Sequence, residues 1–265
     1  MKIALVQMDV AHGKPVENKK HVKEMLERAL VASPDVIVLP EMWNTGYALD
    51  ELDGLADKEG LESQEFLSQF AREHAVAILG GSVAIERDGK FYNTTYVYNK
   101  SGNLINIYSK VHLFGLMAED RYMSAGDAES IFELDGVIAA SVICYDIRFP
   151  ELAKLMAEAG AQILFYPGAF NMTTGPAHWE LTFRSRALDN QVYCVGVAPA
   201  LNKDASYHSY GHSIIANPWG EVIVQLDEQE NMEIAEIDLE EIKKVRTELP
   251  LLKNKRSDLY KINLI

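Results

Sequence analysis

Hydrophobic residues recur along the chain with two alternating periods. Residues 2–8 form a short apolar run that predicts a strand, and Pro15 begins a segment whose apolar residues are spaced three and four apart, as in a helix. Ser33-Pro34 ends that helix. Residues 35–39 then form an apolar run with few polar breaks, which is typical of a strand covered on both faces. This order of elements indicates an α/β protein.

The same two patterns continue to the end of the chain. Further strands are predicted at 76–85, 91–99, 104–109, 131–134, 137–143, 161–167, 191–198, 212–216, 221–226 and 232–237, and further helices at 61–74, 150–159, 176–189 and from Leu239. Asp88-Gly89 and Asp135-Gly136 are hairpin signals. Residues 42–60 and 111–130 show no clear period and are expected to be irregular. We expect residues 1–265 to form a single domain of mixed sheets covered by helices, with an extended basic tail from about residue 245.

Composition and charge argue against two classes of binding partner and indicate the compartment of the protein. The 265 residues are 48% hydrophobic, enough for a substantial core, and carry a formal net charge of −14. That charge argues against nucleic acid or an anionic membrane surface as a partner. Two cysteines, no signal-peptide pattern and no apolar run long enough to cross a bilayer lead us to expect a cytoplasmic protein without a membrane partner.

One cysteine lies where a predicted buried strand meets a polar turn. The segment GVIAASVICYDIRFPE (136–151) carries Cys144 directly after an apolar run, and Pro150 suits the first position of a following helix. Ligands of open α/β sheets collect outside the carboxyl ends of strands, so this thiol is a candidate nucleophile. The alternative is a packed, inert thiol, and that interpretation is preferred for Cys194, which lies inside an apolar strand.

Two charged residues follow other strands in the same way. Glu41 comes after strand 35–39 and one proline, and Lys110 follows strand 104–109. If these strands share an orientation, both side chains emerge with Cys144 at one edge. Acyl transfer from an amide needs such a set: a base for a thiol whose free pKa is about 8.5, and a cation where the carbonyl oxygen gains charge. Taken singly, each charged residue is more ordinarily a solvated surface group.

Other site chemistries have little support in the sequence. It contains no GxGxxG, Walker A, HExxH, CxxC or GxSxG pattern. His208 and His212 are four residues apart but lie in a predicted loop, which is a weak signal for metal binding. His112 and His178 are expected to make structural hydrogen bonds or to line the pocket. We therefore expect neither a metal nor a cofactor.

Three motifs resemble those of the nitrilase superfamily of carbon–nitrogen hydrolases. They are LPEMWNTGY (39–47), YSKVHLF (108–114) and ICYDIRFPEL (143–152), in the order Glu, Lys, Cys that the family has. The resemblance implies a four-layer α-β-β-α sandwich that pairs into a homodimer.

The resemblance also implies a role for particular residues. Glu41 would be the general base, Lys110 the cation or proton donor at the oxyanion, and Cys144 the nucleophile. The matching stretch AEDRYMSAGD (118–127) nominates Glu119, which would orient Lys110 and the base. The backbone N–H of Tyr145 would complete the oxyanion hole.

A narrower resemblance points to a substrate class. Residues 166–191, 209–222 and 255–260 are similar to the ω-amidase branch, which hydrolyses the terminal amide of 2-oxoglutaramate and 2-oxosuccinamate. This implies a small-molecule amide that carries an α-keto carboxylate. Phe170 and Tyr47 would wall the pocket, although both are also interpretable as ordinary core aromatics.

Two polar residues are candidates for binding that keto acid. Arg148, four residues after the nucleophile, would hold the carboxylate with its planar fork, and Thr174 would donate a hydroxyl hydrogen bond. The alternatives are a structural ion pair of Arg148 with Asp146 or Glu151, and a turn role for Thr174.

The sequence therefore predicts a cytoplasmic, cofactor-free amidase that forms a thioester intermediate. The same chemistry on deaminated glutathione, an N-carbamoyl amine or an aliphatic nitrile is the nearest alternative. A catalytically silent scaffold protein on this fold is a further alternative, and a metal-dependent amidohydrolase lacks a ligand cluster.

Overall fold

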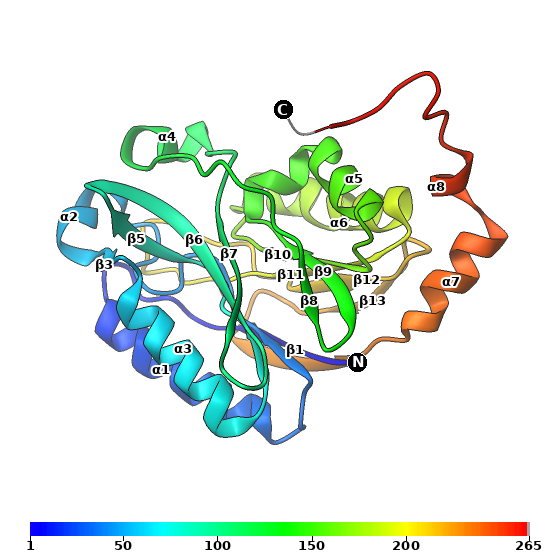
Figure 1. The fold of residues 1–265 in the computed structure, drawn as a ribbon. Coiled ribbons are helices and arrows are strands. Elements are labelled where there is room, and N and C mark those ends of the chain that lie inside the picture. Colours follow the sequence, from blue (N-terminus) through cyan, green and yellow to red (C-terminus); the bar gives the residue numbers. More distant parts are fainter. Residues whose placement is uncertain (264–265) are drawn as a thin grey trace.

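Two β-sheets lie face to face between layers of helices in the computed structural model, which describes residues 1–263 (Figure 1). The first sheet contains β1 (Lys2–Gln7), β2 (Val36–Val38), β3 (Asp57–Lys58), β4 (Ala77–Leu79), β5 (Val83–Arg87), β6 (Lys90–Tyr98), β7 (Leu104–Ser109) and β14 (Asn231–Glu236). The second contains β8 (Phe132–Leu134), β9 (Val137–Ser141), β10 (Ile163–Pro167), β11 (Tyr193–Val197), β12 (Ile214–Ala216) and β13 (Val222–Gln225). The first sheet has the order β14-β1-β2-β4-β6-β5-β3, with β7 paired to β6, and the second runs β13-β12-β11-β10-β9-β8.

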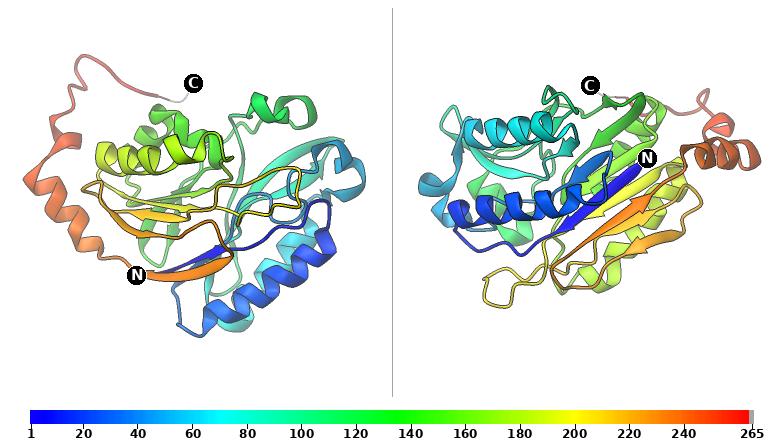
Figure 2. Two further views of the ribbon diagram at one scale, coloured as in Figure 1. Left: turned by 180° about the vertical axis from the view of Figure 1, so that it is seen from behind. Right: turned by 90° about the horizontal axis from the view of Figure 1, so that it is seen from below.

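Four long helices cover the outer faces of the sheets. They are α1 (Pro15–Leu30) and α3 (Leu61–His74) on the first sheet, and α5 (Pro150–Glu158) and α6 (Gly175–Asn190) on the second (Figures 1 and 2). The other helical segments are η1 (Leu49–Glu51), α2 (Leu52–Leu55), η2 (Gly115–Met117), α4 (Glu119–Tyr122), η3 (Cys144–Arg148), α7 (Leu239–Glu248) and α8 (Leu251–Asn254). No helix within residues 1–263 is long and apolar enough to span a membrane.

Alternate residues along each strand fill different interfaces between layers. In β1, Leu5 packs between the two sheets, whereas Val6 packs with the helices of the first sheet. In β10, Phe165 packs between the sheets, whereas Leu164 packs under α5 and α6. Both faces of these strands are thus buried, as the continuous apolar run predicted for β10. Three hydrophobic clusters fill three interfaces, which confirms the four-layer α-β-β-α sandwich.

The prediction of one strand over 76–85 was wrong. The segment forms two short strands, β4 and β5, that both pair with β6, and the chain breaks between them at Gly80 and Gly81. Gly81 has a φ of +60°, and a Cβ there would lie 2.1 Å from the Pro40 carbonyl oxygen. The break places Ser82 beside the segment that follows β2. The Ser82 N–H donates a hydrogen bond to the Pro40 carbonyl, and the Ser82 hydroxyl accepts one from the Met42 N–H.

The two predicted hairpins form, and the two irregular stretches contain only short elements. β5 and β6 pair around Asp88-Gly89, and β8 and β9 around Asp135-Gly136. The C-terminal segment remains helical past residue 245, because α7 ends at Glu248 and α8 follows it (Figure 2).

Candidate active site

Two of the predicted charges emerge at the same edge of the first sheet. β2 is parallel to β4, β4 is antiparallel to β6, and β6 is antiparallel to β7, so β2 and β7 run in the same direction. Glu41 follows β2 and Lys110 follows β7. The shared orientation that the sequence analysis required is therefore present within this sheet, while Cys144 arrives from β9 of the opposite sheet.

Lys110 and two glutamates form a buried ion-pair cluster. The Lys110 Nζ lies 3.0 Å from Oε1 of Glu41, and 2.9 and 2.8 Å from the two carboxylate oxygens of Glu119. All three side chains are at most 1% exposed. The Phe114 N–H also donates to Glu119, at 2.7 Å. Buried charges persist when they are paired and hydrogen-bonded, and here one cation faces two anions.

Two further groups, which the sequence analysis missed, fix the Glu41 carboxylate. The Asn93 side-chain amide donates to Oε1 at 2.9 Å, and the Ala169 N–H donates to Oε2 at 2.8 Å. Oε1 thus accepts from both Asn93 and Lys110, whereas Oε2 accepts from one backbone donor. A carboxylate oxygen has two lone-pair directions, so Oε2 keeps the capacity to accept a proton.

Cys144 occupies a strained turn that Asp146 braces. Its φ of +46° lies in the left-handed region, which costs roughly 1–2 kcal/mol for a residue with a side chain. The buried Asp146 carboxylate accepts hydrogen bonds from the Ile143 N–H at 2.9 Å, the Tyr108 hydroxyl at 2.8 Å, and the His112 N–H and Nδ1 at 3.0 and 2.8 Å. Asp146 therefore ties the thiol turn to the segment that carries Lys110.

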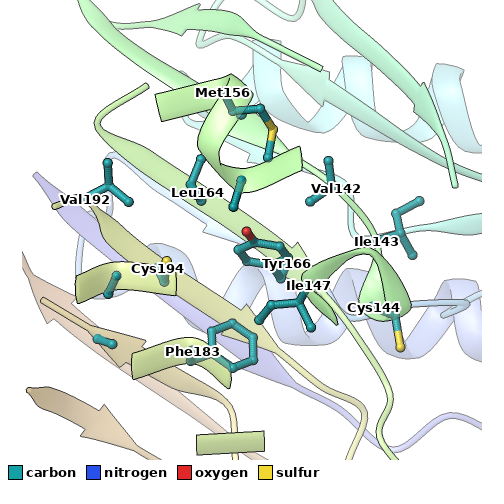
Figure 3. Close-up of a cluster of buried hydrophobic side chains, with 14 of the residues drawn as sticks. Val142, Ile143, Cys144, Ile147, Met156, Leu164, Tyr166, Phe183, Val192 and Cys194 are labelled. Atoms are coloured by element: carbon teal, nitrogen blue, oxygen red, sulfur yellow. The ribbon is translucent and has the colours of Figure 1, made fainter. Parts of the chain in front are cut away.

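Close packing holds the same turn from the other side. A Cβ at Gly168 would lie 3.2 Å from the Cys144 Cα, so glycine allows β10 to end directly against the turn. Figure 3 shows Cys144 at the edge of the hydrophobic cluster, on the turn, and Cys194 within the cluster. The interpretation of Cys194 as a packed core thiol agrees with its complete burial.

The electrostatics of the cluster favour a neutral thiol and a charged lysine. Burial and then the charge of Glu41 raise the pKa of Cys144 well above its ordinary value. Burial alone would lower the pKa of Lys110, but the charges of Glu41 and Glu119 raise it well above its ordinary value. Burial raises the pKa of Glu119 against the opposing charge of Lys110. At neutral pH the thiol therefore keeps its proton until a base removes it.

Arg148 has no carboxylate partner within residues 1–263, so the alternative ion pair with Asp146 or Glu151 does not form. Its guanidinium lies 4.5 Å from the ring centroid of Phe170 and 3.1 Å from the His178 Nδ1. Phe170 is buried against Trp179. Among the described residues the guanidinium hydrogen-bonds only His178, which leaves most of its donors for an anion.

Thr174 and Tyr47, both predicted to bind the substrate, have different surroundings. The Thr174 hydroxyl donates to the Asn171 side chain at 3.1 Å, in the turn before α6, which fits the turn role that the sequence analysis gave as the alternative. Tyr47 packs against Tyr207, with ring centroids 4.5 Å apart, and both line a cavity with Glu41. Tyr207 was missed because its loop, SYHSYGHS, carries no periodic signal.

His112 and His178, which were expected to make structural hydrogen bonds or to line the pocket, form hydrogen bonds with Asp146 and Arg148, respectively. His208 and His212 each bond a backbone carbonyl. Within residues 1–263 no group of three or more His, Cys, Asp or Glu side chains is placed to hold a metal ion.

Comparisons with known proteins give a consistent result. A family model described as carbon-nitrogen hydrolase matches residues 2–247. The omega-amidase NIT2 of Xenopus tropicalis is 42% identical over 268 residues, covering 98% of this chain and 97% of that protein. The 2-oxoglutaramate amidase of Bacillus subtilis is 40% identical over 258 residues, covering 97% and 98%. The crystal structure of Saccharomyces cerevisiae Nit3, a member of branch 10 of the nitrilase superfamily, superposes with a TM-score of 0.91 at 37% identity, over 97% and 96% of the two chains.

Proposed function

The chain belongs to the carbon–nitrogen hydrolase family, and we propose that it is an ω-amidase, which releases ammonia from the terminal amide of a small α-keto dicarboxylic acid monoamide such as 2-oxoglutaramate. The observation that carries the proposal is the buried cluster of Glu41, Lys110 and Glu119, whose charges act on the Cys144 thiol. Together with Cys144, this cluster supplies the base, the cation and the nucleophile that amide hydrolysis through a thioester requires.

The reaction begins with proton transfer. Glu41 takes the proton of Cys144, and the sulfur attacks the amide carbon. The oxygen of that carbonyl becomes negative and is held by the Lys110 ammonium and the Tyr145 N–H. The tetrahedral intermediate collapses, the C–N bond breaks, and the nitrogen leaves as ammonia with the proton that Glu41 had taken. Glu41 then activates a water molecule that hydrolyses the thioester, and Glu119 keeps Lys110 in place throughout.

The substrate assignment rests on Arg148. Its guanidinium has no carboxylate partner among residues 1–263, lies over Phe170, and is on the same short turn as Cys144. A planar fork of donors fits a carboxylate better than a point charge does. Such a local cation also explains how a chain with a net charge of −14 would attract an anionic substrate, since distant surface charges are screened beyond about 8–10 Å.

We also expect a cytoplasmic homodimer. Both cysteines are free, as in a reducing compartment. On the outer face of α6, Leu181 is 64% exposed and Leu188 is 41% exposed. Large apolar side chains gathered on one helix are typical of an interface between subunits. Sedimentation velocity at micromolar concentration tests the dimer, and a single monomer-sized species would remove it.

The decisive experiment measures ammonia release from 2-oxoglutaramate, glutamine, asparagine and a simple aliphatic amide, with and without iodoacetamide. We expect a strong preference for the keto-acid amide that iodoacetamide abolishes. The Cys194→Ala variant is the matched control and should remain sensitive to the reagent. Thiol-dependent release from another amide alone would keep the chemistry and discard the ω-amidase assignment, and silence on all four would direct attention to nitriles and carbamoyl compounds.

A further inference from the structure

The hydroxyl of Tyr47 is a buried donor without a partner. No residue in the described part of the chain, 1–263, forms a hydrogen bond with it. Tyr47 as a whole is only half-buried, so the part of the side chain that reaches solvent is not its oxygen. A buried polar group that lacks a partner destabilises the folded state, and such a group therefore calls for a ligand or another compensating role.

The hydroxyl lies within the field of the proposed reacting groups. Burial, and then the neighbouring charge of Glu41, raise the pKa of Tyr47 well above its ordinary value, so the phenol stays protonated. Tyr47 lines a cavity together with Glu41 and Tyr207. The Tyr207 hydroxyl already donates to the Ala169 carbonyl. Of these two packed tyrosines, only Tyr47 has its O–H available.

The surrounding charges limit what this donor can bind. The two negative charges of Glu41 and Glu119 exceed the single positive charge of Lys110. The carboxylate of a substrate would therefore be repelled from this position. An uncharged carbonyl oxygen is an acceptor without that penalty. In the proposed function the reacting carbonyl already has its donors, Lys110 and the Tyr145 N–H, and Arg148 takes the carboxylate. The keto oxygen is the acceptor that remains.

We propose that the Tyr47 hydroxyl donates a hydrogen bond to the α-keto oxygen of the substrate and so determines specificity for keto-acid amides. The assignment rests on the proposed function, because it concerns one oxygen of that substrate. It gives Tyr47 a polar role in place of the apolar wall that the sequence suggested.

The test compares Tyr47→Phe with wild type on three amides. These are 2-oxoglutaramate, glutaramate (the same chain with a methylene group in place of the keto group) and butanamide, which lacks both the keto group and the carboxylate. We expect kcat/KM for 2-oxoglutaramate to fall about five- to tenfold, as for the loss of one neutral hydrogen bond, and kcat/KM for the other two amides to stay within about twofold. The Tm should be equal to or above that of wild type, because the change removes an unpartnered hydroxyl.

Tyr98→Phe is the matched control. The Tyr98 hydroxyl is also buried and unpartnered within residues 1–263, but the ring lies in the core between the first sheet and its helices. We expect this variant to leave all three activities unchanged.

Three outcomes would overturn the assignment. An equal loss on all three amides would place the hydroxyl at the reacting carbonyl, and no loss on any would show that it binds only water. A Tm several degrees below that of wild type would make the role structural. A wild-type enzyme that hydrolyses butanamide but not 2-oxoglutaramate would overturn the proposed function itself, and the wild-type data alone distinguish that case.

Discussion

Asn93 should control how well Glu41 works as a base. Its side-chain amide donates to Oε1 of Glu41 at 2.9 Å, deep in the protein, and no step of the proposed reaction places it against the substrate. We therefore expect Asn93→Ala to lower kcat while KM changes little. The physical reason is positional: without Asn93, the carboxylate loses a donor that holds its orientation toward Cys144.

The size of the effect follows from the type of bond. A hydrogen bond to an ionised group contributes about 1.5–3 kcal/mol, which corresponds to roughly 10- to 150-fold in kcat if the orientation matters only in the transition state. Asn93→Asp sharpens the test because the two side chains have the same shape. The new carboxylate would lie about 3 Å from Glu41, and two carboxylates at that distance share one proton, which occupies the base. The Asp variant should therefore be less active than the Ala variant at neutral pH.

Steady-state ammonia release at several substrate concentrations separates kcat from KM, and thermal unfolding reports whether each variant is folded. Thr95→Val is the matched control: Thr95 is two residues along β6, and its hydroxyl is buried without a partner in residues 1–263. It should retain wild-type kcat. A folded Asn93→Asp enzyme with wild-type activity, or Asn93→Ala with kcat within twofold of wild type, would refute the role given to Asn93.

Three further predictions test the rest of the site. Cys144→Ala should abolish turnover without lowering the Tm. Cys194→Ala should lower the free energy of unfolding by about 1–2 kcal/mol and leave kcat near that of wild type. Equal activity of wild type and Cys144→Ala would refute the mechanism. Arg148→Lys should raise KM for 2-oxoglutaramate about tenfold and leave butanamide unaffected, and an unchanged KM would remove Arg148 from the site. In the folded protein Cys144 and Cys194 keep their protons to higher pH than in the unfolded chain, so the free energy of unfolding should fall as the pH rises above about 9, by up to about 1.4 kcal/mol per pH unit for each retained proton. Urea unfolding between about pH 8 and pH 10 measures this slope, and a flat profile would contradict it.

The hydrophobic pattern predicted the buried strands, because a strand that is covered on both faces is apolar along its length, whereas the order of the four layers came only from the family resemblance. Residues 35–39 and 161–167 are apolar on both faces, and each packs one face against a helix layer and the other against the opposite sheet. The break within 76–85 could not be predicted in the same way. Its cause is the approach of Gly81 to the Pro40 carbonyl, a contact between segments forty residues apart in the chain. A hydrophobic pattern does not record such contacts.

In the candidate site, too, some residues could be predicted from local sequence patterns and others could not. Glu41, Lys110 and Cys144 could be nominated because each follows a strand, and strand ends are visible in the sequence. Glu119 came only from the family resemblance, since α4 has four residues and no periodic pattern. Asp146 entered the sequence analysis as part of a polar turn and as an alternative partner of Arg148. Its role in bracing the thiol turn depends on Tyr108, which is 38 residues away.

One signal for Asn93 was nevertheless present in the chain. Residues 93 and 97 of β6 point to the same side of the sheet, because side chains alternate along a strand. Val97 packs between the two sheets, in a wholly apolar setting, whereas Asn93 is equally buried and polar. A buried amide costs free energy unless it is hydrogen-bonded, so an asparagine at an interior position implies a polar partner brought by another part of the fold. Here the partner is Glu41. A buried asparagine at an interior strand position therefore indicates where in a sandwich the chemistry lies, and its hydrogen bonds identify which group it serves.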